Sequence, residues 1–400
     1  MLYIDYIIIP LIFIFICIPS IMISLELILG QRNKIDSFEL NLPKDRSPCV
    51  ILMPAHNEEL VIQETIEALM TQLISDDRLI VIADNCTDRT VEICNKFSIE
   101  VIERHNKDKV GKGYALDYGV GYLEKSKIIP NTIVVLDADC QFATSSLDYL
   151  VKQCQIKDSV AQSLYLMKSL DGKNVKSRVS EFAWLVKNKI RPTGLSKMKV
   201  GCHLQGSGMA FPWRVFNEIS FSSGSIVEDL ELGLKLANID EVVLFVPSSI
   251  VTSYFPMSSS GTETQRIRWE HGHLSALTML PKIMFNALLK HNFKALLLAL
   301  DASIPPTILW FFIVSLISFF SILLHFFELS FSLFLTLPTL FIMLLLFFVS
   351  WLFNGRHILK LNDLFGVVRY ILSKFSLYKR FVTDRQVGWV RTDRESKDEK

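Results

Sequence analysis

The sequence predicts an α/β domain with a mainly parallel sheet, flanked by transmembrane helices. Composition is the first reason: half of the 400 residues are apolar and only 21% are charged, against about 25% charged in ordinary soluble proteins. Second, long uncharged stretches lie near both ends of the chain. Third, short β-branched runs alternate with helical patterns between those stretches, which is typical of βαβ units.

Charge and cysteine content exclude several other classes. The net charge is +1, from 42 basic and 41 acidic residues, so we expect no nucleic-acid partner. The 7 cysteines are scattered and form no C-x-x-C pair. An odd, scattered set argues against a disulfide scaffold or a structural zinc site, and we interpret these cysteines as reduced thiols in a cytosolic compartment.

Three apolar stretches are long enough to cross a bilayer, which takes about 20 residues as a helix. They cover residues 6–25, about 302–327, and 329–353. A cleaved signal peptide is the alternative for the first stretch. It would need a basic start, and the chain starts MLYIDY, with Asp5 and no Lys or Arg. An N-terminal anchor is therefore favoured.

Basic residues flank these stretches on one side only. The first stretch is followed by Arg32, Lys34, Lys44 and Arg46, and the third by many Lys and Arg between 356 and 391, whereas the link between the second and third offers His325 and Glu328. Positive flanks favour the cytosol. We therefore expect an integral protein of the inner or plasma membrane, with its N-terminus outside and residues 31–300 and the C-terminus in the cytosol.

The predicted organisation has four parts. Residues 1–30 form the anchor, 45–290 a cytosolic domain, 295–353 two membrane helices, and 354–400 a further helix and cytosolic tail. Residues 354–381 alternate basic and apolar, which suits a helix lying on anionic membrane lipid. An ordinary amphipathic helix packed on the cytosolic domain is the alternative.

In the cytosolic domain, strands are expected at 49–54, 78–84, 98–104 and 132–139, and helices at 58–73, 89–97, 113–124 and 145–155. No G-x-G-x-x-G follows the first strand and no G-x-x-x-x-G-K-[ST] occurs. Dinucleotide binding and a P-loop hydrolase are therefore disfavoured.

Polar residues stand where three of these strands end: Asn57 and Glu58, then Asp84, then Asp137 and Asp139. In open α/β sheets the ligand crevice lies outside the carboxyl ends of the strands. Carboxylates repel a phosphate unless a divalent cation lies between them, and Mg²⁺ and Mn²⁺ favour carboxylate oxygens. Turn formation is the alternative for Asp84.

Seven segments, in order, resemble the membrane-bound family 2 glycosyltransferases. They are PAHNEE, ADNCTDRT, GKGYAL, LDADC, LQGSGMAF, VEDLELGLKL and QRIRW, between residues 48 and 275. Relatives in that family include cellulose, hyaluronan and poly-N-acetylglucosamine synthases. The resemblance implies a GT-A fold and inverting transfer of a sugar from a nucleotide sugar, usually a UDP-sugar, at the cytosolic membrane face.

The resemblance also implies donor-binding residues. Asn57, Glu58 and Asp84 would hold the base and ribose. Lys112 would lie near the nucleotide end of the donor, the alternative being a surface loop lysine. Asp137 would face the nucleotide.

The metal role would fall to Asp139, which would ligate Mg²⁺ or Mn²⁺ on the diphosphate. A diphosphate is a poor leaving group until its developing charge is neutralised, and a bound cation does this as a Lewis acid.

For the acceptor side, Glu228-Asp229 matches the family's ED pair, in which the Asp is the general base. The alternative for these residues is that they are first-turn acids favoured by the helix dipole. The loop containing Gly206 and Ser207 resembles the family's acceptor-side loop, in which glycines permit close backbone approach.

Gln265, Arg268 and Trp269 match the Q-x-x-R-W signature of processive members, and in a helix these positions share one face. Gln265 and the Arg268 fork would hold the donor diphosphate, and Trp269 would stack against the acceptor sugar. A membrane-interface Trp with flanking Arg is the alternative. We expect one helix over roughly 262–290, leading toward the second membrane stretch.

Three spans are fewer than the best-known polymer synthases carry. The Q-x-x-R-W residues favour extension of a polysaccharide, whereas the small membrane part favours transfer of a single sugar to a lipid-linked or glycan acceptor, or an additional membrane subunit for export. A non-catalytic sensor of nucleotide sugars would be expected to have lost Asp137, Asp139 or Asp229. A transporter is disfavoured because three spans are few and their cores hold no charge apart from Asp301 at one edge.

Overall fold

The computed structural model describes residues 9–31, 45–127, 129–170, 174–256, 259–326 and 331–383. The chain divides into two compact units. The helical unit comprises 1–33, 173–200 and 273–385, and the sheet unit comprises 34–172, 201–272 and 386–400. The predicted 45–290 segment is therefore not one compact unit, because residues 173–200 and 273–290 group with the membrane-candidate helices.

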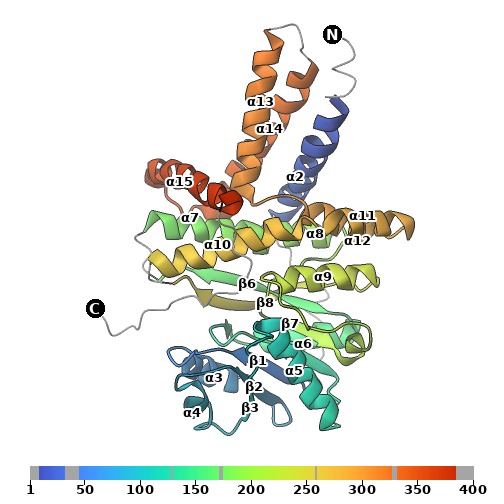
Figure 1. Ribbon diagram of the computed structural model, residues 1–400, viewed down its shortest axis with the longest axis vertical. Helices are drawn as coiled ribbons and strands as arrows, with labels where there is room; N and C mark the ends of the chain where they lie inside the picture. The colour runs from blue at the N-terminus through green and yellow to red at the C-terminus, as the bar shows by residue number, and fades with distance from the viewer. Residues whose placement is uncertain are drawn as a thin grey trace. The chain divides into compact units, whose positions relative to one another are not determined.

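The sheet unit contains an eight-stranded sheet in the order β3-β2-β1-β4-β7-β6-β8-β5 (Figure 1). Its strands are β1 (Val50–Ala55), β2 (Arg78–Asp84), β3 (Glu100–Arg104), β4 (Thr132–Val135), β5 (Gln141–Phe142), β6 (Ala161–Lys168), β7 (Met209–Pro212) and β8 (Leu244–Tyr254).

The α/β class is confirmed, and the sheet is mixed. The pairs β1–β2, β1–β4 and β2–β3 are parallel. The buried, continuous apolar runs of β1, β2 and β4 are typical of parallel strands. In the second half, β7 runs antiparallel to both β4 and β6, β5 runs antiparallel to β8, and β6 and β8 are parallel. The prediction of a mainly parallel sheet therefore describes the first four strands.

Helices connect the strands close to where the sequence predicts them. They are α3 (Ile62–Met70), α4 (Thr90–Cys94), α5 (Lys112–Lys125), α6 (Ser146–Lys157) and α9 (Glu228–Asn238), followed by the start of α10 (Ser259–Ala276). The predicted strand 132–139 ends at Val135. Asp137 and Asp139 therefore lie beyond the ladder, where their backbone does not serve sheet pairing.

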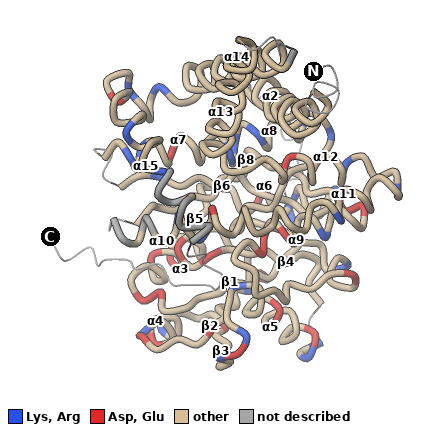
Figure 2. Tube along the Cα trace, turned by 45° about the horizontal axis from the view of Figure 1, so that its top comes forward, with Lys and Arg blue, Asp and Glu red and all other residues tan. Residues whose placement is uncertain are grey.

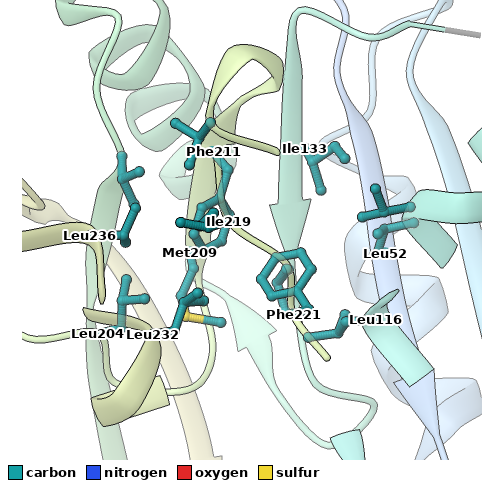
Figure 3. Close-up of a cluster of buried hydrophobic side chains, with 14 of the residues drawn as sticks. Leu52, Leu116, Ile133, Leu204, Met209, Phe211, Ile219, Phe221, Leu232 and Leu236 are labelled. Atoms are coloured by element: carbon teal, nitrogen blue, oxygen red, sulfur yellow. The ribbon is translucent and has the colours of Figure 1, made fainter. Parts of the chain in front are cut away.

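One hydrophobic cluster holds the starts of α5 and α9 over the sheet. Figure 3 shows Leu52 and Ile133 from the sheet facing Leu116 of α5, with Leu232 and Leu236 of α9 in the same cluster. Burying a leucine or isoleucine side chain fully contributes roughly 1.5–3 kcal/mol. Because both helices pack on this core, their first turns are fixed relative to the carboxyl end of β4.

The helical unit is built from helices at both ends of the chain and from its middle. They are α2 (Ile18–Gly30), α7 (Val175–Leu185), α8 (Arg191–Lys197), α11 (Leu280–Leu289), α12 (Phe293–Ala302), α13 (Thr307–His325), α14 (Phe331–Ser350) and α15 (Leu364–Thr383), with π-helical turns at Phe13–Cys17, Val186–Ile190 and Trp351–Gly355.

Three helices among the described residues are long and apolar enough to cross a membrane: Ile9–Gly30, Thr307–His325 and Ser332–Gly355. Figure 2 shows α13 and α14 in tan throughout, because neither contains Lys, Arg, Asp or Glu. The predicted spans are thus found as helices. Residues 6–8 of the first predicted span, together with Arg32, Lys34, Lys44 and Glu328, lie outside the described residues.

The first of these helices differs from the uncharged span predicted at 6–25, because it continues to Gly30 and includes Glu26. The Glu26 side chain is fully buried and accepts a hydrogen bond from Arg191 Nε at 2.7 Å. Asp301 of α12 pairs with the Nη2 of the same guanidinium. A carboxylate is therefore accommodated in an apolar helix through a buried ion pair with a residue far away in the sequence.

Two predicted helix boundaries are wrong, and proline lies near both. The expected helix over 262–290 divides into α10 and α11, and Pro281 stands in the first turn of α11. The second span starts at Thr307 instead of about 302, after Pro306. Proline lacks an N–H and is best tolerated in the first turn of a helix.

α15 is the helix predicted within 354–381, and it starts later, at Leu364. Tyr370 and Lys374 are buried, and a Cβ on Gly366 would meet the side chain of Val175 of α7 at 2.7 Å. Phe365 and Leu372 are exposed. One side of α15 thus packs within its own unit, while apolar side chains on it stay uncovered. The tail from residue 384 lies outside the described residues.

Candidate active site

The loops after β1 and β2 are joined by the side chain of Asn57. Its Oδ1 accepts a hydrogen bond from the Thr87 amide at 2.7 Å, and its Nδ2 donates to Thr87 Oγ1 at 3.1 Å. The Glu58 amide donates to Thr90 Oγ1 at 2.8 Å. Asn57 adopts a left-handed backbone, φ 56°, which asparagine tolerates better than most residues. The predicted Asn57 and Glu58 therefore lie directly beside the loop that follows Asp84.

Asp84 ends β2 and is paired with a residue that the sequence patterns did not single out. Arg104 Nη1 donates to Asp84 Oδ1 at 2.6 Å, and both side chains are buried. Burial raises the pKa of Asp84, while Arg104 opposes the shift. Asp84 and Arg104 are register partners on β2 and β3. In the sequence, the basic residue at the end of the third strand is the feature that could have predicted this ion pair.

Asp137 and Asp139 follow β4 at the opening between β1 and β7. The Asp137 amide donates to Ser207 Oγ at 3.0 Å. Ligand atoms of Asp137, Asp139 and Cys140 all lie within 4.8 Å of one another. Burial raises the pKa of the Cys140 thiol, and Asp139 adds to that shift, so this cysteine stays protonated. The two carboxylates match the oxygen ligands that Mg²⁺ and Mn²⁺ prefer.

Lys112, the first residue of α5, pairs with the carboxylate of Asp137. Its Nζ also donates to the Gly206 carbonyl at 2.6 Å. Burial alone would lower the pKa of Lys112, but Asp137 and Glu228 raise it, so the ammonium stays charged. With 17% of its side chain exposed, Lys112 is not the surface loop lysine considered as an alternative.

The loop after Leu204 brings main chain between Lys112 and α9. Gly206 and Gly208 have φ of 92° and 66°, a region that glycine enters without the strain other residues incur. A Cβ on Gly206 would stand 3.4 Å from Asp229 Oδ2 and 3.9 Å from Lys112 Nζ. The predicted loop residues Gly206 and Ser207 are therefore brought together with Asp229, Lys112 and Asp137.

Glu228 and Asp229 open α9 and are half-buried. Burial and the neighbouring charge of Asp229 raise the pKa of Glu228 to about 7, with Lys112 opposing. The Leu230 amide donates to Asp229 Oδ1 at 2.8 Å. Both acids lie in the first turn of α9, where the helix dipole stabilises negative charge. Glu231 lies in the same turn, and its carboxylate accepts a hydrogen bond from Ser223 Oγ at 3.3 Å.

Lys112, Glu228 and Asp229 border a small, partly open hollow. It is lined by Lys112, Leu116, Met209, Ser220, Phe221, Ser223, Glu228, Asp229, Leu232 and Lys235. Two lysines and two acids thus share one partly open space, floored by side chains of the core in Figure 3.

Gln265, Arg268 and Trp269 lie on α10, Gln265 buried and the other two half-buried. Gly272, later in the same helix, packs closely on the segment before Glu228, since a Cβ there would meet Val227 Cγ1 at 2.6 Å. α10 thus lies beside the start of α9. The functions assigned to its three side chains stay predictions.

A family model described as Glycosyl transferase family group 2 matches residues 132–353, more than half of the chain. The chain belongs to this family. A second model, Glycosyl transferase family 2, matches residues 50–213 of this glycosyltransferase. Together the matched ranges contain the strand ends, the 204–208 loop, the Glu228-Asp229 turn and α10.

Two relatives resemble this glycosyltransferase in sequence. Probable glycosyltransferase YdaM of Bacillus subtilis is 27% identical over 260 residues, which are 59% of this chain and 59% of the relative. Glycosyltransferase GlyA of Streptococcus pneumoniae is 22% identical over 247 residues, 57% of this chain and 33% of the relative. This glycosyltransferase therefore matches less than two thirds of either relative.

Among solved structures, the mannosyltransferase PcManGT from Pyrobaculum calidifontis, in complex with GDP-Man and Mn²⁺, is similar over 92% of this chain and 97% of its own, with a TM-score of 0.50 and 14% identity. At this identity the similarity concerns the fold, and it supports a GT-A arrangement of the mixed sheet.

Proposed function

We propose that this family 2 glycosyltransferase transfers a sugar with inversion from a nucleotide sugar to a growing polysaccharide at the cytosolic face of a membrane. One observation carries the proposal: Asp229, Lys112 and Asp137 converge on the Gly206–Ser207 loop. A carboxylate base, a fixed cation and a strand-end acid pair are the groups that displacement of a nucleoside diphosphate requires.

The nucleotide, a UDP in our proposal, occupies the edge formed by the ends of β1 and β2. Asn57 and Glu58 face the ribose, and Asp84 accepts a hydrogen bond from an N–H of the base. Pairing with Arg104 at 2.6 Å favours the ionised carboxylate that such a bond needs.

Asp139, with Asp137 beside it, would hold a divalent cation, whose chemistry when bound is Lewis-acid stabilisation of the leaving diphosphate. Asp137 faces the nucleotide and keeps Lys112 in place. The Lys112 ammonium, the Arg268 guanidinium and Gln265 add positive charge or hydrogen-bond donors toward the same diphosphate. The Mn²⁺ and GDP-Man in PcManGT are compatible with this assignment.

Asp229 is the general base. Its carboxylate takes the proton of the acceptor hydroxyl, the acceptor oxygen forms a bond to the anomeric carbon, and the bond from that carbon to the diphosphate oxygen breaks. A single displacement inverts the anomeric centre and releases the nucleoside diphosphate. Glu228 stands next to the base, and Gly206 and Ser207 border the acceptor.

The three apolar helices among the described residues and the one-sided basic residues support a membrane placement. We propose an N-terminus outside, a cytosolic catalytic domain within 45–290, two spans within 295–353, and an α15 that rests on lipid. Phe365 and Leu372 are exposed on α15. An additional membrane subunit would supply a path for export.

The test of the activity is transfer of radiolabel from a panel of nucleotide sugars to lipid or polymer, using membranes that contain the full chain. We expect one UDP-sugar to be used and EDTA to abolish transfer. No transfer from any donor, or full activity in EDTA, would contradict the proposal.

Transfer of a single sugar is the second candidate, favoured by a membrane part with three candidate spans. Product length separates the two, because stacking on Trp269 would hold a chain between additions. We expect Trp269→Ala to keep UDP affinity while shortening the products. If wild-type membranes with excess acceptor yield only products with one added sugar, the single-transfer function replaces extension.

A further inference from the structure

The 204–208 loop sits between the proposed base and the acid pair, yet it has little regular structure of its own. Residues 201–205 belong to no helix or strand, and 206–208 form bends before β7. Buried backbone N–H and C=O groups in such a segment need partners outside it. The loop must therefore be held from the neighbouring strands.

Gln162 of β6 supplies several of those partners. Its side chain is fully buried. Its Nε2 lies 2.9 Å from the Ser207 carbonyl oxygen and 2.8 Å from that of Ser163, and its Oε1 accepts from the Gln205 amide at 2.8 Å. One carboxamide thus satisfies groups on both sides of Gly206.

A carboxamide suits this position for a chemical reason. The NH₂ group offers two donors and the carbonyl oxygen accepts, so glutamine can serve two carbonyls and one amide at once. Leucine would fill the space but remove all three hydrogen bonds. Glutamate would place an acceptor against the Ser207 and Ser163 carbonyls unless it were protonated.

The loop in turn touches both sides of the proposed site. The Gly206 carbonyl accepts from Lys112 Nζ at 2.6 Å, and Ser207 Oγ accepts from the Asp137 amide at 3.0 Å. On the other side, Asp229 Oδ2 stands 3.4 Å from where a Gly206 Cβ would be. A shift of the loop would therefore move the carbonyl that holds the Lys112 ammonium and the hydroxyl that holds the Asp137 amide, both beside Asp229.

We propose that Gln162 is a positioning residue that holds the 204–208 loop, and through it the Lys112 ammonium and the Asp137 main chain beside the proposed base. The expected effect on kcat rests on the proposed function. The expected loosening of the loop rests on the hydrogen bonds alone. The expected penalty lies in kcat, since misplacement of about 1 Å can cost on the order of 10²-fold in rate.

The test compares Gln162→Leu and Gln162→Glu with a matched control, Gln155→Leu. Gln155 also joins separate segments, donating to the Ser47 carbonyl at 3.1 Å and to Thr132 Oγ1 at 3.2 Å, but at the opposite end of β4. We expect Gln162→Leu to lower kcat at least 10-fold with UDP affinity within about twofold, and Gln155→Leu to leave kcat nearly unchanged.

Gln162→Glu adds a readout that a general loss of stability would not change. Burial favours the protonated carboxyl, which regains one donor as pH falls. We expect its kcat relative to wild type to recover toward low pH, whereas that of Gln162→Leu stays low. If Gln162→Leu does not fold, the pH dependence of Gln162→Glu tests the proposal in its place.

Hydrogen exchange separates failure of this inference from failure of the proposed function. The amides of Gln205 and Asp137 should exchange faster in both Gln162 variants than in Gln155→Leu, whether or not any sugar is transferred. Unchanged exchange at both amides, or a kcat for Gln162→Leu equal to that of Gln155→Leu in an active enzyme, would overturn the proposal.

Discussion

Each unit of this glycosyltransferase holds a cation between carboxylates, and the two clusters are built differently. In the helical unit, Arg191 joins Glu26 and Asp301, and both acids are buried. In the sheet unit, Lys112 pairs with Asp137 and donates to a backbone carbonyl, beside a hollow that also borders Asp229.

The two cations differ in how freely their hydrogen-bond donors can be redirected to a new partner. A guanidinium fork directs its donors to two fixed carboxylates, and in this unit it links α8 to α2 and α12. An ammonium is a point charge with rotatable donors. In the proposed function Lys112 would therefore turn toward the negative charge of the donor diphosphate. The comparison then separates a cluster suited to stability from one suited to the proposed chemistry.

The largest expected effect is on the base beside the Lys112 cluster. Asp229→Asn should keep UDP affinity and lower transfer by about 10²–10⁴-fold, because general-base catalysis is lost. Sugar transfer and UDP binding are measured together. Glu231→Gln, in the same helix turn and bonded to Ser223, is the control. Transfer within a few-fold of wild type in Asp229→Asn would remove Asp229 from the mechanism.

The second-largest effects are expected from removing the cation of each cluster, which tests the comparison between the two units directly. Arg191→Met should lower the free energy of unfolding by about 3–5 kcal/mol, because it leaves buried carboxylates without their partner. Lys112→Met should lower transfer far more than stability. Thermal unfolding in detergent and activity are measured for both. A stable Arg191→Met protein, or an active Lys112→Met enzyme, would break the distinction.

The smallest expected effect concerns Glu228, whose pKa rises from 4.5 in its ordinary state to about 7. The folded protein favours the neutral form, so this residue's contribution to stability is complete below pH 4.5 and is lost as pH rises to about 7. Glu228→Gln should therefore gain stability relative to wild type across that interval and stay level above it. Thermal midpoints measured from pH 4 to 8 check this, and parallel curves would refute it.

Local patterns predicted a large part of this molecule. The apolar runs predict three candidate spans, and the β-branched runs predict β1 to β4. In β1, β2 and β4, burial on both faces leaves a continuous apolar signature. Asp137 and Asp139 could be found because they follow such a run directly. The break at α10–α11 is also marked in the sequence, by Pro281 in the first turn of α11.

Pairings between distant residues were decided only by the tertiary structure. Arg104 meets Asp84 through strand register, Arg191 meets Glu26 across 165 positions, and Gln162 reaches the Ser207 carbonyl from another strand. Periodicity reports which face of a helix or strand is buried, and it carries no information on what that face meets. The sequence therefore determined the elements and the acids at their ends, whereas packing and register chose the partners that set the charge and position of those acids.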